Sequence, residues 1–253
     1  NYDDTTGDGM VAWCWKAGGS GSSNEDGSIN TTSTSANVAA GFSISTYTGT
    51  GSLATVGHGL SVAPSLVIIK RRNEAQSWMV GTEQSVASVD WTDRNYLEQD
   101  GAWADNIAYW NDTAPTADVV TINTDAAVNE SSDTYVMYCF HNVEGYSKIG
   151  AYIGNSNTDG TFIYCGFRPA YVLLKSTSLA EGWHAQDAVR SPYNVVNENL
   201  EPDTSGAESS SSARYVDFLS NGFKLRTSDS GKNTATYLFY AIAETPFKNA
   251  NAR

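Results

Sequence analysis

Hydrophobic and polar positions follow a strand-like pattern along most of the chain. Between Phe42 and Tyr47, apolar and hydroxyl side chains alternate with a period of two, which is typical of a strand with one buried face. Other stretches are continuous runs of β-branched, aromatic and aliphatic residues, and these runs predict buried strands. They cover residues 66–69, 119–122, 135–140, 171–174, 223–225 and 237–243.

Turn-forming residues separate the predicted strands. Asp159-Gly160 and Asn221-Gly222 are typical hairpin or loop positions. Pro64 and Pro169 stand at the starts of strands, where a missing backbone N–H costs least. No amphipathic helical pattern is longer than three turns. The pattern therefore predicts an all-β protein in which antiparallel sheets pack as β-sandwiches.

The same strand pattern occurs twice. PSLVIIK at residues 64–70 and PAYVLLK at residues 169–175 lie 105 positions apart. Further pairs keep the same order with offsets of 102 to 105 residues: Tyr47 and Tyr152, Gly49 and Gly154, Trp78 and Trp183, Leu97 and Leu200, and Tyr135 and Tyr237. Order, spacing and residue type agree together, which indicates an internal duplication. We predict two tandem β-sandwich domains, residues 41–144 (repeat A) and residues 145–253 (repeat B).

Residues 1–40 precede the first repeat and are predicted to contain one more strand. MVAWCW at residues 10–15 resembles VMYCF at residues 136–140. We expect it to be the last strand of an earlier repeat in a longer protein. The alternative is that it completes a sheet of repeat A. The Gly- and Ser-rich stretch that follows is predicted to be a linker or a long surface loop.

Composition narrows the classes of function. The chain has 28 acidic and 15 basic residues, a net charge of −13. Because its longest basic run is Lys70-Arg71-Arg72, we predict that it binds no nucleic acid and inserts into no membrane. The three cysteines lie in apolar runs without a CxxC motif, so we interpret them as buried hydrophobic residues rather than as a disulfide framework or a zinc site.

The usual catalytic patterns are missing from the sequence. No two of the three histidines have metal-ligand spacing, and there is no glycine motif for a nucleotide. His184, Asp187 and Ser191 are the pieces of a hydrolase triad but lack the GxSxG elbow, so we interpret them as loop residues. We therefore predict no catalytic residue, no metal and no cofactor.

One stretch, residues 90–110, combines aromatic and acidic side chains in a way that repeat B does not share. Because the fold of repeat B forms without it, its side chains are candidates for contact with a glycan or a protein partner. The candidates are Trp91, Tyr96, Trp103, Tyr109, Trp110, Asp93 and Asp100. The alternative is that these rings cap the sandwich or pack between the repeats. Trp78 and Trp183 recur in both repeats and are predicted to be core residues.

Several motifs together resemble a known group of proteins. They are VEGYSKIGAYIGN, GFRPAYVLLK, RSPYNVV, DFLSNGFKLR and ETPFKNANAR, with VAWCWKAGG and GFSISTYTGTGS upstream. The sequence is similar to the C-terminal repeat domain of virion structural proteins of tailed, especially marine, bacteriophages. Members of this group are described as structural or tail-fibre proteins or as a domain of unknown function. The resemblance covers nearly the whole chain and implies no catalytic residue.

The resemblance implies a non-enzymatic virion protein at the particle surface. The first hypothesis is a tail-fibre or surface-appendage component that displays loops, residues 85–115 and 188–214, for attachment to a host glycan. The second is a purely architectural capsid-decoration or tail subunit. The third is a polysaccharide depolymerase. The expected partners are other virion subunits, further copies of this chain, as a trimer in the manner of fibres, and a host surface glycan.

Overall fold

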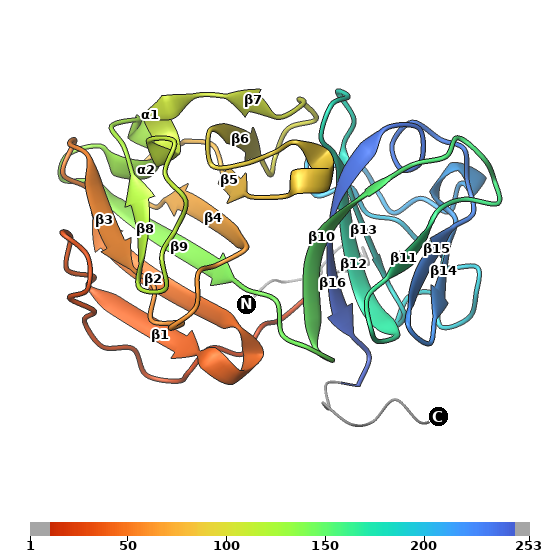
Figure 1. Cartoon of the computed structure of the whole chain (residues 1–253), viewed down its shortest axis with the longest axis horizontal. Helices are drawn as coiled ribbons and strands as arrows, with labels where there is room; N and C mark the ends of the chain where they lie inside the picture. Colours follow the sequence, from red (N-terminus) through yellow and green to blue (C-terminus); the bar gives the residue numbers. More distant parts are fainter. Residues whose placement is uncertain (1–10, 246–253) are drawn as a thin grey trace, which may run out of the picture.

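The structure, a computed structural model, describes residues 11–245. In this part of the chain, two β-sandwiches lie side by side (Figure 1). Sandwich A is formed by β1 (Ser33–Asn37), β2 (Phe42–Thr48), β3 (Ala54–Gly57), β4 (Leu66–Arg71), β5 (Met79–Thr82), β6 (Asp93–Tyr96), β7 (Ala104–Asp105), β8 (Val119–Ile122) and β9 (Thr134–Phe140). Sandwich B is formed by β10 (Ser147–Ile153), β11 (Phe162–Tyr164), β12 (Pro169–Ser176), β13 (Trp183–Asp187), β14 (Val216–Leu219), β15 (Gly222–Leu225) and β16 (Thr236–Ala243).

Only short helices connect these strands. They are η1 (Val38–Ala40), η2 (Ser85–Ala87), α1 (Ile107–Trp110), α2 (Ala126–Asn129) and η3 (Ser212–Arg214). Within residues 11–245, no helix has the length and apolar character needed to cross a membrane. Each strand predicted within residues 41–245 is present, and the paired strands of every sheet are antiparallel. The predicted all-β class is therefore confirmed.

The two sandwiches share a strand order. The large sheet of sandwich A contains β2-β9-β4-β5 within the order β1-β2-β9-β4-β5-β6-β7, and the large sheet of sandwich B is β10-β16-β12-β13. The small sheets, β3-β8 and β11-β15-β14, correspond in the same way. Tyr47 pairs with Tyr135 in sandwich A, and Tyr152 pairs with Tyr237 in sandwich B. The halves have the same core topology, and their origin by duplication stays a prediction.

Hydrogen bonds repeat between the halves as well. The Tyr47 hydroxyl donates to the Val128 carbonyl at 2.6 Å, and the Tyr152 hydroxyl donates to the Lys232 carbonyl at 2.8 Å. Both tyrosines are buried and stack on the partner ring with centroids 5.1 Å apart. These equivalent contacts stabilise the same end of the central strands in each sandwich.

We expect the changes Tyr47→Phe and Tyr152→Phe each to lower the free energy of unfolding by about 1 kcal/mol, because each removes one buried hydrogen bond and leaves a carbonyl unpaired. Urea denaturation of the two variants measures this. Tyr193→Phe is the control. Because the Tyr193 side chain is exposed, this change should leave the free energy of unfolding unaltered. A clear loss in only one of the two variants would show that the contacts are not equivalent.

Residues 11–40 differ from the predictions. Residues 11–15 form no strand, and residue 10 lies outside the described residues. The period of two in this stretch arises because Trp13 and Trp15 pack inward while Cys14 is exposed, without backbone pairing. The predicted linker is instead part of sandwich A, because it includes β1, which pairs with β2 along its whole length. The prediction of three buried cysteines is confirmed for Cys139 and Cys165 and is wrong for Cys14, which is exposed while its neighbours Trp13 and Trp15 pack against the apolar cluster.

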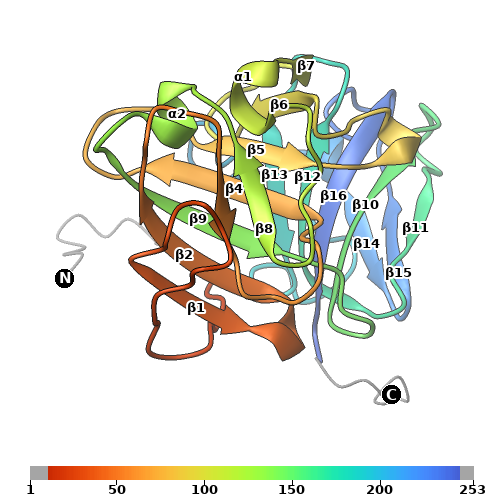
Figure 2. The same cartoon turned by 60° about the vertical axis from the view of Figure 1, so that its left-hand side comes forward.

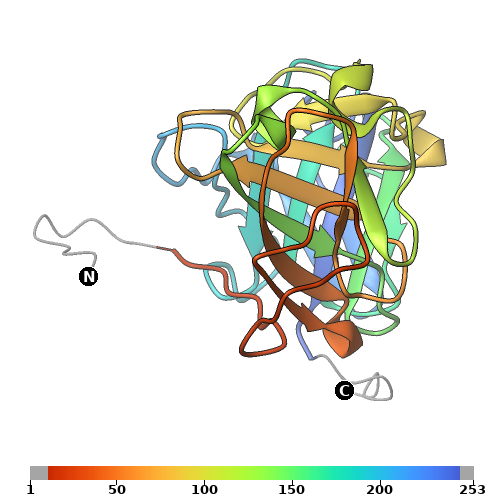
Figure 3. The same cartoon turned by 90° about the vertical axis from the view of Figure 1, so that its left-hand side faces the viewer.

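The large sheets of the two sandwiches lie face to face, with their strands running crosswise (Figure 3). The small sheets lie on the outside, so the molecule has four layers (Figure 1). An apolar cluster joins the inner layers, with Phe42, Leu66, Val80 and Phe140 from sandwich A and Ile149, Tyr171, Leu173, Trp183, Ala185, Leu238 and Tyr240 from sandwich B. Burial of such a surface holds the two domains in one arrangement.

Candidate functional site

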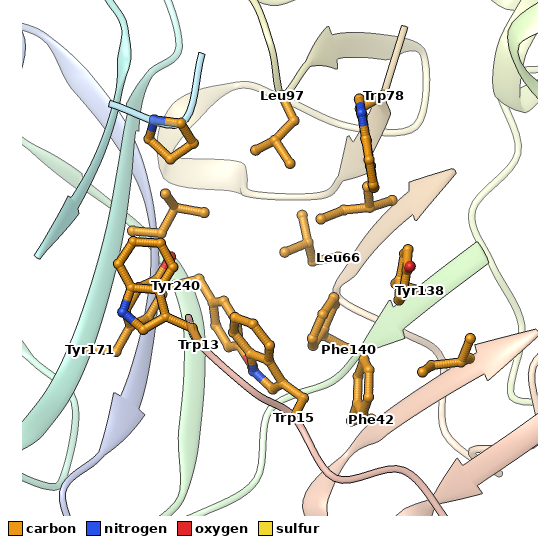
Figure 4. A pocket seen from close by; sticks show the side chains of 14 residues that line it. Trp13, Trp15, Phe42, Leu66, Trp78, Leu97, Tyr138, Phe140, Tyr171 and Tyr240 are labelled. Carbon is orange, nitrogen blue, oxygen red and sulfur yellow. The ribbon is translucent and has the colours of Figure 1, made fainter. Parts of the chain in front are cut away.

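A hollow lies between the two large sheets. It has a volume of about 420 Å³, and we call it the interdomain groove (Figure 4). Nearly all of its lining side chains are aromatic or aliphatic. They are Trp13, Trp15, Phe42, Ile44, Leu66, Ile68, Trp78, Leu97, Tyr138, Phe140, Tyr171, Leu173, Pro202 and Tyr240.

Strand alternation explains why this surface is apolar. On β9, Met137 and Cys139 point into the core of sandwich A, so Tyr138 and Phe140 point outward to the groove. On β4, Val67 and Ile69 are inward and Leu66 and Ile68 outward. The apolar runs of the sequence are continuous because both faces of these strands are covered.

The N-terminal segment reaches across the groove. The Trp15 ring lies edge-on to Phe140 of sandwich A, with centroids 6.1 Å apart, and to Tyr171 of sandwich B at 6.0 Å. Its indole N–H donates to the Tyr240 hydroxyl at 3.1 Å. The Trp13 indole N–H donates to Asp187 at 3.2 Å, and the Arg190 guanidinium lies over the Trp13 ring. This segment therefore fastens to both sandwiches.

The groove offers few polar groups to a ligand. Its polar side-chain atoms are the hydroxyls of Tyr138, Tyr171 and Tyr240 and the indole nitrogens of Trp13, Trp15 and Trp78. Burial raises the pKa of Tyr171 and Tyr240 well above the usual range, so these two hydroxyls stay neutral at physiological pH. Carbohydrate sites combine aromatic rings with several hydrogen-bonding groups, whereas this lining suits apolar side chains.

The structure buries three of the predicted contact residues. Trp91, Tyr109 and Trp110 belong to the core of sandwich A, and Trp110 is 0% exposed. The Trp91 and Trp110 rings meet edge-on, with centroids 5.6 Å apart. A Cβ atom at Gly81 on β5 would lie 2.6 Å from both rings, so this position requires glycine. These rings offer no face to a glycan.

Of the other four predicted residues, Tyr96, Trp103 and Asp93 are half-buried and Asp100 is exposed, and each makes contacts within the chain. The Tyr96 hydroxyl bonds the Tyr109 hydroxyl at 3.2 Å, and Trp103 packs against the apolar cluster between the sandwiches. The Asp93 carboxylate accepts the Asp90 N–H at 3.2 Å, and partial burial raises its pKa. Asp100 contributes its backbone carbonyl to Lys175 of sandwich B. This is the arrangement in which the rings cap sandwich A and pack between the repeats.

The triad-like residues of sandwich B are also apart in their contacts. His184 Nδ1 lies 3.5 Å from a Glu201 carboxylate oxygen. Asp187 pairs with Arg190 at 2.7 Å, and the Ser191 hydroxyl bonds Asn197 at 3.2 Å. Burial, with the nearby cations Lys232 and Arg214, lowers the pKa of His184 well below its usual value. The imidazole is neutral, and its Nε2 has no hydrogen-bond partner among the described residues, so His184 and Ser191 are not bonded to each other.

Residues 188–195 form an exposed loop within the predicted display stretch 188–214, and it contains a tyrosine that was not among the predicted contact residues. Val189 and Tyr193 are 87% and 82% exposed. Asn194 holds the loop, because its side chain accepts the Phe218 N–H at 2.8 Å and donates to the Phe218 carbonyl at 2.9 Å. The signal in the sequence was a single tyrosine between Pro192 and Asn194, both turn residues.

Trp78 and Trp183, predicted as core residues, have different surroundings. Trp183 is buried between the sandwiches, where its indole N–H donates to the Tyr96 carbonyl at 2.9 Å. Trp78 is half-buried, lines the groove and stacks on Tyr138. In each repeat the backbone N–H of this tryptophan donates to a carboxylate, Glu98 or Asp203. Within residues 11–245, no group of three or more His, Cys, Asp or Glu side chains is arranged to hold a metal ion.

Comparison with known proteins identifies one family. No curated protein and no solved structure matches the chain. Residues 1–246 match the model of one protein family, described as Domain of unknown function (DUF7483). That match extends through both sandwiches and the N-terminal segment. The chain therefore belongs to this family, a domain of unknown function.

Proposed function

We propose that the chain is a structural component of a tailed-phage virion, in which the two sandwiches form a rigid spacer of a tail fibre or other surface appendage. The phage part of the proposal rests on the resemblance of the motifs quoted above. Its partners would be other virion subunits, including further copies of the chain. The protein acts through its shape and its surfaces and not through catalysis.

The observation that carries the structural part is the apolar layer between the sandwiches. A spacer keeps its shape only if its domains do not rotate freely, and a buried hydrophobic interface prevents such rotation. Trp183, Phe140 and Tyr240 provide this interface, and the N-terminal tryptophans reinforce it. The aromatic side chains within residues 90–110 also take part in internal packing. This favours a structural role for that stretch over a role in binding a glycan.

The test is the location of the chain in particles of the virus that encodes it. We expect mass spectrometry of gradient-purified particles to detect the chain in many copies. Antibodies against the purified chain should label the tail or the capsid surface in electron micrographs. Particles that lack the chain, or labelling restricted to disrupted particles, would contradict the proposal.

Attachment to a host glycan is a second candidate function, favoured by loop 188–195. The loop presents the Tyr193 ring to solvent on a backbone held by Asn194. An exposed, fixed tyrosine can stack on a sugar ring and hydrogen-bond through its hydroxyl. The loop lies within residues 188–214, one of the two stretches that we predicted to carry attachment.

A glycan array with the purified chain tests this second function. We expect Tyr193→Ala to weaken binding to any captured glycan by roughly tenfold or more, because removal of a stacked ring costs 1–3 kcal/mol in comparable stacking interactions. Tyr193→Phe, which keeps the ring, should retain most of the binding. Equal binding by both variants and the original chain would exclude the loop as the attachment site.

A further inference from the structure

In sandwich A, one side of the molecule is covered by the segment that precedes β2. Residues 24–31 pass over β3, where the Ile29 N–H donates to the Thr55 carbonyl at 3.0 Å and the Ile29 side chain is buried in the core. The chain then returns as β1, which pairs with the edge of β2. This segment therefore closes the space between the edges of the two sheets.

In sandwich B, the described residues leave the corresponding side uncovered. β10 corresponds to β2 and β11 to β3, and each is the last strand of its sheet. The two strands lie on the same side of sandwich B (Figure 2). The Asn142 side chain bonds both the N–H and the carbonyl of Ile149, so these backbone groups point to the edge and are already paired. By alternation, Ala151 and Ile153 also direct backbone groups to this edge. The Ile153 carbonyl accepts the Thr161 hydroxyl at 2.8 Å, which leaves both Ala151 groups and the Ile153 N–H for a further strand.

A pocket opens between these two edges. It has a volume of about 210 Å³ and is lined by Lys148, Gly150, Tyr152, Phe162, Tyr164 and Phe239, among others. Gly150 takes the place of Ser45, whose hydroxyl contacts Thr34 of β1 in sandwich A. Phe162 and Tyr164 are 41% and 60% exposed, whereas the matching positions, Thr55 and Gly57, lie under residues 24–28.

Charge indicates what kind of segment fits. Lys148 forms no ion pair within the described residues, and its amine donates to the Tyr164 carbonyl at 2.9 Å above the Tyr164 ring. An ammonium group has three donors, so two remain for a carboxylate. The covering segment of sandwich A carries such a group, because Asp26 precedes Ile29 by three residues.

We infer that the β10–β11 side of sandwich B is a docking site for an extended segment of another polypeptide. The segment pairs with the backbone of Ala151 and the Ile153 N–H at the edge of β10, places a branched aliphatic side chain in the pocket, and presents a carboxylate to Lys148. This mode of binding combines main-chain hydrogen bonds with one side-chain pocket. The inference follows from the comparison of the two halves and does not depend on the proposed function.

A labelled peptide with the sequence of residues 21–37 is the probe, titrated into the purified chain by fluorescence anisotropy. We expect saturable binding that Tyr164→Ala and Lys148→Glu each weaken by roughly tenfold, since each removes one anchoring contact. Tyr193→Ala is the matched control, because Tyr193 is an exposed tyrosine on a different loop, and it should bind as the original chain does. A peptide with Ser in place of Ile29 should bind more weakly.

Hydrogen exchange locates the bound peptide. It should slow the exchange of the Ala151 and Ile153 amides and leave β1 unchanged. Three outcomes would overturn the inference: no binding at millimolar peptide, binding that is equal in all variants, or protection at β2 instead of β10. Self-association of the chain that Lys148→Glu abolishes would also overturn it, because the occupant would then be a second copy.

Discussion

Trp183→Ala should lower the free energy of unfolding by about 3–5 kcal/mol and should separate the unfolding of the two sandwiches. Trp183 is 2% exposed and lies at the centre of the interface cluster, so its removal leaves a large cavity between two domains rather than inside one. It also leaves the Tyr96 carbonyl without its donor. Calorimetry should show one transition in the original chain and two in the variant.

Two variants make this result specific. Trp183→Phe keeps most of the buried area and loses the indole hydrogen bond, so we expect a loss of about 1–2 kcal/mol and a single transition. Trp78→Ala changes the matching residue of sandwich A, which is half-buried and lines the groove, and should cost less than Trp183→Ala. Equal losses at the two positions would show that Trp183 does not fasten the domains.

The sequence was sufficient to predict the central strands of both sandwiches. The central strands are apolar at nearly every position, as in residues 66–69, 135–140 and 237–243. One face of each strand packs into the core of its own sandwich, and the opposite face packs toward the other sandwich. The short strands β6 and β7 at one end of the large sheet carry polar residues, and β11 has only three residues, so no periodic signal marked them. These segments are strands because they pair with a neighbouring strand, which their local sequence pattern does not reveal.

The candidate site was harder to predict because aromatic residues serve burial and recognition equally well. Trp110 and Tyr193 both lie in turn-rich, polar stretches, yet one is fully buried and the other 82% exposed. Tertiary contacts decide which ring is buried. Gly81 on a distant strand leaves room for Trp110, and Asn194 holds Tyr193 outward by a hydrogen bond with the Phe218 backbone. Gly81 and Phe218 are both too far away in the sequence for a local pattern to reveal these contacts.

The interdomain groove was absent from the predictions for a related reason. Its lining comes from both repeats and from residues 13 and 15, so it exists only once the sandwiches are packed. The sequence did contain one sign of it. Outward-facing positions on β2, β4 and β9 are apolar in a strand arrangement where a solvated face would be polar.

The interface also contains a buried lysine, and this predicts a dependence of stability on pH. Lys175 is 0% exposed, and its amine donates to the carbonyls of Asp100 at 3.0 Å and Glu181 at 2.7 Å. Burial lowers its pKa to about 8, partly opposed by the carboxylates of Asp203, Asp100 and Glu181. In the unfolded chain the amine keeps its proton up to a pH of about 10.

Between pH 8 and 10 the unfolded state therefore binds more protons at Lys175 than the folded state, and stability from this group rises with pH. Below pH 8 both states are protonated and the cost of burying the charge is fully present. Relative to Lys175→Met, the original chain should gain about 2 kcal/mol between pH 8 and 9.5. Both proteins contain Lys232, the other buried lysine, so its contribution cancels when one free energy of unfolding is subtracted from the other.

Urea denaturation of both proteins at several pH values between 7 and 9.5 measures this gain. The upper limit keeps the buried tyrosines from interfering, because burial raises the pKa of Tyr47 and Tyr152 and their contribution would lower stability above pH 10. Lys70→Met is the matched control: Lys70 occupies the same position in sandwich A but is half-buried. The free energy of unfolding of Lys70→Met should change with pH in the same way as that of the original chain. If the curve of Lys175→Met also ran parallel to that of the original chain, the interface would hold the Lys175 amine without an energetic cost.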